Sequence, residues 1–202
     1  RNGRKNMQLR MVRTNLLDLP EIKMPSDYRL RTYRENDDWH WANVINASFE
    51  GSRTAVDTRE QIIDRPEFEP TGLFFSTYQD QPVGTACAWK WNNADESEVG
   101  QLHMVGVIPE HSGYRLGRGV SLAVLHYHHQ QGFKCVVLGT DDFRLPAIKT
   151  YLNLGFIPIY VDDDQPERWQ VIFEKLKLPF LFDSVDKVRS VLNENIITKI
   201  YR

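Results

Sequence analysis

The chain has few cysteines, no long apolar run and almost no excess of charge, and each shortage excludes a class of protein. Its 202 residues contain only Cys87 and Cys135, too few for the disulfide framework of a small secreted domain. No apolar run approaches the roughly 20 residues that a membrane span requires, so we expect no membrane association. The formal net charge is −2. Nucleic-acid-binding domains usually carry a basic face, so we expect no nucleic-acid partner.

What the chain does contain is the composition of a globular enzyme domain. Hydrophobic residues make up 41% and charged residues 26%, which argues against a disordered or fibrous chain. The basic stretch at residues 1–20 lacks the continuous apolar core of a secretory signal, so we expect a cytoplasmic protein. Pro20 and Pro25 bracket a linker-like stretch. We therefore predict an N-terminal extension over 1–24, a domain over 25–177 and a helical extension over 178–202.

Hydrophobic periodicity and turn residues predict a mixture of strands and helices. Strands are indicated at 28–33, 73–78, 82–91, 99–108, 135–140 and 156–161. Helices are indicated at about 38–50, 58–64, 116–131, 146–154, 166–177 and 184–193, and a turn at 92–95. The order strand, loop, helix, strand over 99–140 is a right-handed crossover unit. The strands at its two ends should therefore be parallel neighbours.

A glycine-rich loop between a strand and a helix carries the strongest chemical signal. Gly113 and Gly117 flank the turn, and glycine permits a positive φ and close approach by a ligand. The first N–H groups of a helix have no internal partner and lie at the positive end of its dipole. This combination predicts a phosphate or pyrophosphate site, with Arg115 and Arg118 adding charge at the rim. A plain turn before a core helix would also explain the glycines.

Other familiar motifs do not account for this loop. A Walker A motif ends in Gly-Lys-Ser/Thr, whereas this chain has Gly117-Arg118-Gly119, and the glycine spacing is not that of a dinucleotide fold. There is no G-x-S-x-G nucleophile elbow. His126 and His129 share a helix face, but no glutamate or cysteine completes a ligand set, so we predict no metal site.

The residues around the loop resemble motif A of the GCN5-related N-acetyltransferases, the GNAT family. The run from Val105 to Gly119 reads V-G-V-I-P-E-H-S-G-Y-R-L-G-R-G. In that family a strand ending in Val-x-Pro-Glu is followed by Arg/Gln-x-x-Gly-x-Gly/Ala. Here Ser112 stands at the Arg/Gln position, Arg115 at the central glycine and Gly117 at the last position.

A second run, downstream, resembles motif B of the same family. Residues Ala147 to Phe156 match the end of Asn-x-x-Ala-x-x-x-Tyr-x-x-x-Gly-Phe, with Tyr151 at the tyrosine and Arg144 in place of the asparagine. The spacing between the two motifs also fits. The resemblance covers about residues 28–161 and is specific over 99–156.

The resemblance implies an α/β fold: a twisted mixed sheet, mostly antiparallel, with helices on both faces and one parallel strand pair that splays apart. It implies acetyl-CoA as donor, a small-molecule or peptide amine as acceptor, and direct attack in a ternary complex. Val105 N–H would hold the acetyl carbonyl and Val107 would pair with the pantetheine arm. The residues implied in cofactor binding are Val105, Gly106, Val107, Ser112, Gly113, Tyr114, Arg115, Leu116, Gly117, Arg118 and Arg144.

Three side chains are candidates for proton transfer. Tyr151 aligns with the family's general acid, and a phenol with a pKa of ~10 stays protonated until a thiolate appears. A helix-face aromatic with its hydroxyl satisfied elsewhere is the alternative. His103, two residues before Val105 and expected on the same strand face, and Glu98 are candidates for the base. A hydrogen-bonded strand histidine is the alternative for His103.

Two questions stay open at this point. The departures at Ser112, Arg115 and Arg144 also suit a non-catalytic acyl-CoA-binding or sensor domain. The last segment, 177–202, could pack on its own domain or on a partner subunit, which leaves a homodimer open.

Overall fold

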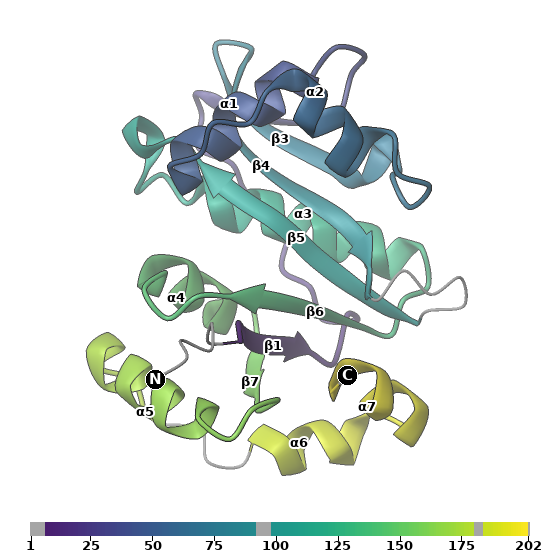
Figure 1. Ribbon diagram of the computed structural model, residues 1–202, viewed down its shortest axis with the longest axis vertical. Helices are drawn as coiled ribbons and strands as arrows, with labels where there is room; N and C mark the ends of the chain where they lie inside the picture. The colour runs from purple at the N-terminus through teal and green to yellow at the C-terminus, as the bar shows by residue number, and fades with distance from the viewer. Residues whose placement is uncertain (1–6, 92–97, 180–183, 202) are drawn as a thin grey trace, which may run out of the picture.

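The computed structural model describes residues 7–91, 98–179 and 184–201, which form one mixed sheet with helices on both faces (Figure 1). The strands are β1 (Leu9–Arg13), β2 (Tyr28–Thr32), β3 (Leu73–Tyr78), β4 (Gln81–Lys90), β5 (Val99–Val107), β6 (Cys135–Thr140) and β7 (Ile157–Ile159). In the described part of the chain their order is β2-β3-β4-β5-β6-β1-β7. Every neighbouring pair is antiparallel except β5 and β6. The predicted mostly antiparallel sheet is confirmed, and the turn expected at 92–95 lies outside the described residues.

The helices follow the predicted order, with one addition. They are α1 (Asp38–Phe49), α2 (Ala55–Thr58), α3 (Leu116–Gln130), α4 (Leu145–Asn153), α5 (Gln165–Leu176), α6 (Ser184–Val191) and α7 (Glu194–Tyr201). A π-helical turn, Arg59–Ile63, continues α2 and completes the helix expected at 58–64. The addition is α7, which the sequence pattern did not predict.

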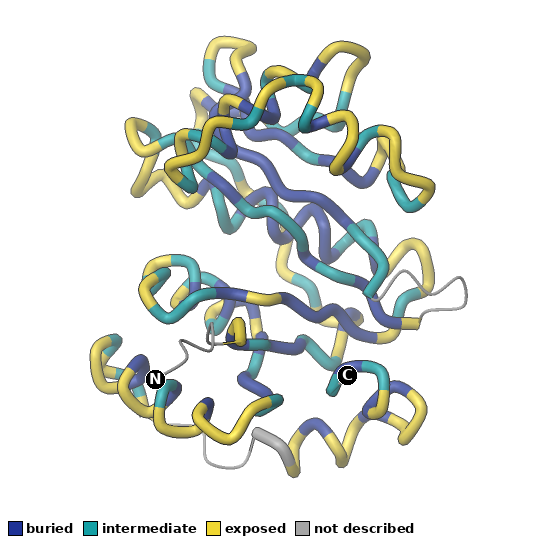
Figure 2. Tube along the Cα trace, viewed as in Figure 1, coloured by how far each residue is buried: buried dark blue, intermediate teal, exposed yellow. Residues whose placement is uncertain are grey.

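Alternation along the central strands decides which helices cover which face. Val136 and Leu138 of β6 pack in the cluster built with α3, α4 and α5. Cys135 and Val137, which alternate with them, pack instead with α6 and α7. Cys87 of β4 packs with α1 on this second face. Figure 2 shows the central strands as the most continuously buried part of the chain.

The parallel pair stays together for only three residues before it opens. The register joins Val99 to Cys135 and Gln101 to Val137, and no further pair between these strands follows in the described residues. Beyond that point β5 stays with β4, whereas β6 stays with β1, and the two strands diverge (Figure 1). The splayed strand pair that the family resemblance implied is therefore present.

The first strand lies inside the sheet, although residues 1–24 were expected to be an extension. β1 is antiparallel to β6 on one side and to β7 on the other. Leu9 and Met11 are fully buried in the cluster with α3, α4 and α5, and Val12 is buried on the opposite face. Residues 9–13 are thus an integral part of the domain. Five residues are too few for a distinct period-two pattern, and both partner strands are distant in sequence.

The last two helices pack on the sheet of their own chain. Val188, Ile196 and Ile200 are buried against the face formed by β1, β6 and β7. Two side chains hold the end of α7: Arg10 donates to the carbonyl of Ile200 at 2.6 Å, and Trp91 Nε1 donates to the carbonyl of Lys199 at 2.9 Å. These donors satisfy carbonyls that have no partner within the helix.

The two aspartates that precede α4, Asp141 and Asp142, make ion pairs and do not cap the helix. The residue at the N-cap position is Arg144, with no side-chain cap. Asp141 pairs with Arg144 at 3.3 Å, and Asp142 pairs with Arg168 of α5 at 2.6 Å. The second pair ties α5 to the end of β6. Both carboxylates therefore pair with arginine side chains, Asp141 with Arg144 and Asp142 with Arg168.

Candidate active site

A cavity of about 450 Å³ lies where β5 and β6 diverge. The loop at 112–118, the last residues of β5 and the first turns of α4 line it. Its lining residues are Ser48, Val105, Gly106, Val107, His111, Ser112, Gly113, Arg115, Leu116, Gly117, Arg118, Arg144, Pro146, Ala147, Thr150 and Tyr151. Ten of the eleven predicted cofactor-binding residues are among these sixteen. The exception is Tyr114, which is exposed and packs its ring on Tyr28 at 5.3 Å.

The glycine-rich loop has the backbone that the anion-site hypothesis requires. Gly113 has a φ of 87° and Arg115 a φ of 59°, and Arg115 is the N-cap of α3 without a side-chain cap. The first N–H groups of α3 therefore receive no bond from the Arg115 side chain. A non-glycine residue in this region costs about 1–2 kcal/mol. The loop thus keeps the expected turn even though arginine replaces the glycine of the motif.

A β-bulge interrupts β5 at the cavity. Thr85 of β4 pairs with Gly106 and Cys87 pairs with His103, so Met104 and Val105 together face Ala86. Met104 has a φ of 52°. In a bulge the extra residue is left out of the ladder, so the regular pairing of β5 with β4 is interrupted beside Val105, which lines the cavity.

The bulge also reverses the side-chain alternation, so the expectation that His103 and Val105 share a face is wrong. His103 pairs with Cys87, whose cluster contains α1, whereas Val105 packs in the cluster with α3. His103 is not among the residues that line the cavity. Period-two counting fails here because it assumes an unbroken strand.

His103 lies in an apolar environment. Its ring is 5.7 Å from that of Trp89, and its Nδ1 is 3.5 Å from Gln101 Nε2. Burial lowers the pKa of His103 to about 4, so the imidazole is neutral at pH 7. Glu98, the other candidate base, precedes β5 at the end away from the cavity. It lies seven positions before Val105, a distance of about 23 Å along an extended strand.

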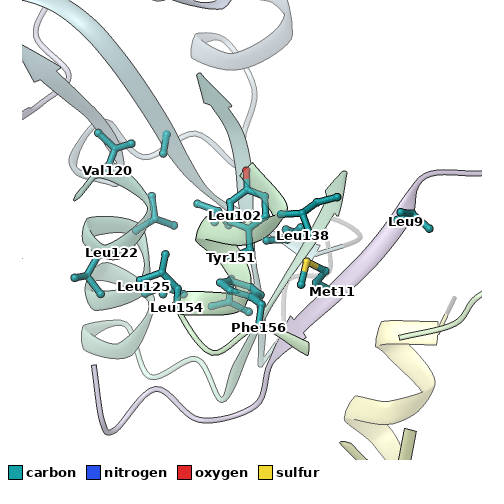
Figure 3. Packing of buried hydrophobic residues seen from close by; sticks show 14 of the residues in the cluster. Leu9, Met11, Leu102, Val120, Leu122, Leu125, Leu138, Tyr151, Leu154 and Phe156 are labelled. Carbon is teal, nitrogen blue, oxygen red and sulfur yellow. The ribbon is translucent and has the colours of Figure 1, made fainter. Parts of the chain in front are cut away.

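Tyr151 is held by the core and lines the cavity. Its ring lies among Leu102, Leu138 and Phe156, and its hydroxyl points away from that cluster (Figure 3). Only 7% of the residue is exposed. Burial raises the pKa of Tyr151 above its ordinary value, and the positive charge of Arg144 acts in the opposite direction. The phenol therefore keeps its proton at neutral pH.

Arg144 joins the two sides of the cavity. Its guanidinium lies 4.0 Å from the centre of the Phe49 ring, which belongs to α1, and 5.2 Å from that of Phe143. Phe143 is 75% exposed. This cation–π contact connects α1, packed on β4 and β5, with the start of α4, beyond β6.

A glycine in β5 lets α1 approach the cavity closely. A Cβ on Gly106 would lie 2.7 Å from the Ser48 hydroxyl. Ser48 donates that hydroxyl to the carbonyl of Val44 at 2.6 Å and lines the cavity. Sequence analysis missed Ser48 because it lies far from both motifs. Ala147, by contrast, is signalled by helical spacing, because it lies four residues before Tyr151, and Thr150 lies three residues after Ala147.

The described residues contain neither a metal-binding group nor a membrane-spanning helix. Within residues 7–91, 98–179 and 184–201, there is no group of three or more histidine, cysteine or carboxylate side chains able to hold a metal ion. Over the same ranges, no helix has the length and apolar character needed to cross a bilayer. Cys87 and Cys135 are buried free thiols, and burial raises the pKa of each to about 12, so neither is an activated nucleophile.

Sequence comparison gives a consistent set of relatives. The model of the acetyltransferase (GNAT) family matches residues 33–156. Mycothiol acetyltransferases from Nocardia farcinica and Rhodococcus erythropolis are 36% identical over 151 residues and 33% identical over 155 residues. Each alignment covers 71% of this chain, and 50% and 51% of the relatives. The chain therefore spans about half the length of these relatives.

Solved structures show the same fold. The GCN5-related N-acetyltransferase from Sphaerobacter thermophilus superposes with a TM-score of 0.61 and 18% identity, covering 76% of this chain and 50% of that one. The AAC(6')-Iy structure, in complex with the bisubstrate analog CoA-S-monomethyl-acetylneamine, has a TM-score of 0.54 and 19% identity. That match covers 65% of this chain and 92% of the other.

Proposed function

Because the chain belongs to the acetyltransferase (GNAT) family, we propose that it transfers an acetyl group from acetyl-CoA to an amine by direct attack in a ternary complex. One observation carries the proposal. A single cavity is lined by the glycine-rich loop at the start of α3, the bulged end of β5 and the buried Tyr151. In this proposal the loop binds the pyrophosphate of the donor, the strand binds the thioester carbonyl, and the tyrosine protonates the leaving thiolate.

The lining residues fit the donor. The Ser112 N–H already donates to the carbonyl of Pro109 at 3.0 Å. The loop from Gly113 to Arg118 offers the backbone N–H groups at the start of α3 to the pyrophosphate, with Arg115 and Arg118 as cations. Val107 is the last residue of β5, where the strand pairs with β4 but no longer with β6. On the side that faces away from β4 it can pair with the pantetheine arm in the manner of an added strand. The volume of about 450 Å³ lies within the usual range of small-molecule sites.

The reaction then needs two protein donors. As the amine attacks the carbonyl carbon, Val105 N–H donates to the developing oxyanion, an interaction that contributes about 3 kcal/mol in comparable sites. As the carbon–sulfur bond breaks, Tyr151 donates its proton to the leaving thiolate. The products are the N-acetylated amine and CoA. Arg144 lies close enough to stabilise the negative charge that Tyr151 acquires.

The amine must also lose a proton, and His103 remains our candidate to accept it. It is neutral at pH 7 because burial lowers its pKa to about 4. It lies on the face of β5 that carries α1, opposite Val105. In this proposal the acceptor reaches the thioester from that face. Because its pKa is low, His103 is a weak base and would act through water.

The relatives guide the choice of acceptor. Several are named mycothiol acetyltransferase, and one structural neighbour is a glucosamine N-acetyltransferase region with a TM-score of 0.57. We therefore propose mycothiol-related amines and amino sugars as the first acceptors to test, with peptide amines as the second class. A homodimer and a cytoplasmic location remain proposals.

Titration of the chain with acetyl-CoA tests the donor site. We expect micromolar binding that falls at least tenfold in Arg118→Glu. Lys149→Glu is the matched control, because Lys149 is exposed on α4 and does not line the cavity. Absence of binding at millimolar acetyl-CoA would reject the proposal.

The Tyr151→Phe variant separates an enzyme from an acyl-CoA sensor, the alternative that the departures at Ser112, Arg115 and Arg144 favour. For an enzyme, we expect kcat to fall by about 10²-fold or more with donor affinity unchanged, since the hydroxyl acts only on the leaving thiolate. Tyr160→Phe is the control. A wild-type chain that binds acetyl-CoA but acetylates none of the acceptors would support the sensor.

A further inference from the structure

His111 lines the cavity, although motif A assigns no role to this position. It ends the short 3₁₀ turn Pro109–His111 that leads from β5 into the loop. Its Nδ1 lies 2.9 Å from the hydroxyl of Tyr28 on β2. The rings of Tyr28 and Tyr78 lie 5.7 and 5.2 Å from the imidazole. Partners on two other strands therefore fix the orientation of this ring.

The contact with Tyr28 decides which nitrogen of His111 is left for a ligand. Tyr28 is 8% exposed and keeps its phenolic proton at neutral pH, so its O–H is able to donate to Nδ1. The proton of a neutral imidazole then lies on Nε2. In the imidazolium form Nε2 also carries a proton. None of the described residues makes a hydrogen bond with Nε2. With Tyr28 donating to Nδ1, and equally in the imidazolium form, His111 presents Nε2–H as a donor.

The position of this donor matches the anionic end of the cavity. His111 directly precedes Ser112, the first residue of the loop, and it lines the same cavity as Arg115 and Arg118. An anion held by the first N–H groups of α3 would lie beside the imidazole. Tyr151 and Arg144, which belong to the acyl end, come from α4 on the other side.

We propose that His111 is a phosphate-binding residue of the donor site, whose Nε2–H donates to a pyrophosphate oxygen, and that Tyr28 positions its ring. This inference rests on the proposed function, and it adds to the loop a side-chain donor from outside the motif. It also offers a reason why Ser112 can stand where the family has arginine or glutamine, because a neighbouring side chain supplies the lost donor.

The test uses His111→Phe, which keeps an aromatic ring between the two tyrosines but removes the donor. The probes are CoA, dephospho-CoA, which lacks the 3′-phosphate, and pantetheine, which has no phosphate, each measured by calorimetric titration or displacement. We expect about tenfold weaker binding of CoA and dephospho-CoA and unchanged binding of pantetheine. His111→Gln, which retains an N–H donor, should recover part of the loss.

Two further variants complete the design. Tyr28→Phe should weaken both pyrophosphate compounds by a smaller factor, without affecting pantetheine. His129→Gln, an exposed histidine in the last turn of α3, should change nothing.

Several results would overturn the inference. An equal loss for all three probes would show that His111 only packs. A loss confined to CoA would place the contact at the 3′-phosphate. Unchanged binding of CoA by both His111 variants would remove the residue from the site. In each of these cases wild-type CoA binding would leave the proposed function standing, whereas no wild-type binding would reject both.

Discussion

Arg115 is a non-glycine residue in a backbone conformation that favours glycine. Its φ of 59° is a conformation that glycine adopts without cost and that other residues reach at about 1–2 kcal/mol. The chain accepts this cost at the loop that we propose binds the pyrophosphate. Strain at a ligand-binding loop is tolerated when the surrounding structure holds the backbone in place. Here α3 and the end of β5 do so.

Comparing two substitutions at Arg115 measures that cost. Both remove the side chain, but alanine keeps the penalty for positive φ. We expect Arg115→Gly to be more stable than Arg115→Ala by about 1 kcal/mol in urea unfolding. At Arg118, inside α3, the order should be reversed, because glycine in a helix is less stable than alanine by up to about 1 kcal/mol. The same order at both positions would contradict the observed loop geometry.

Among the elements, β1 is the strand that local sequence patterns could not predict. Most strands and helices between 28 and 177 could be predicted, because each has its own hydrophobic period and turn residues. β1 has five residues, and its partners, β6 and β7, lie more than a hundred residues away. The bulge at Met104 was equally hidden, since no residue type marks it. It was this bulge that placed His103 and Val105 on opposite faces.

Substitutions of two methionines test whether β1 is part of the folding unit. Met11, on β1, is fully buried in the cluster with α3, α4 and α5, whereas Met7, just before the strand, is 49% exposed. We expect Met11→Ala to lower the free energy of unfolding by about 2–4 kcal/mol, since it leaves a cavity in the core. Met7→Ala should change it by less than about 0.5 kcal/mol. If both variants were equally stable, residues 1–24 would be the dispensable extension that their composition suggests.

At the scale of the whole molecule, the candidate site is assembled from parts that no single motif contains. The two motifs predicted most of the lining, because loop and helix N-terminus are local features of sequence. Ser48 comes from α1 and lines the cavity, and Phe49, also from α1, contacts the lining residue Arg144. Only the packing of α1 on the sheet brings these two residues there. The contact between Phe49 and Arg144 then links α1 with α4. A substitution in α1 can therefore alter the site without touching either motif.

The stability of the whole molecule should fall as the pH drops from about 6.5 to 4, because three histidines have lower pKa values in the fold than in the unfolded chain. Burial lowers the pKa of His103 and of His128 to about 4, and that of His40 is lowered by the same cause. Between pH 4 and 6.5 the unfolded chain thus binds more protons than the folded one, so acid favours unfolding. Asp37 and Asp142, whose pKa values are lowered from 3.8, act in the same direction but at lower pH.

His128 allows this dependence to be measured for a single group. It donates Nε2–H to the carbonyl of Gln101 at 3.1 Å and is almost fully buried, so its charged form is disfavoured in the fold. Each such histidine contributes a slope of up to about 1.4 kcal/mol per pH unit. In urea unfolding between pH 4.5 and 6.5, His128→Gln should reduce the slope by about that amount, whatever its stability at pH 7. His129→Gln, at an exposed position, should leave the slope unchanged. An undiminished slope in His128→Gln would mean that the fold accommodates the charged imidazole, in conflict with its apolar surroundings.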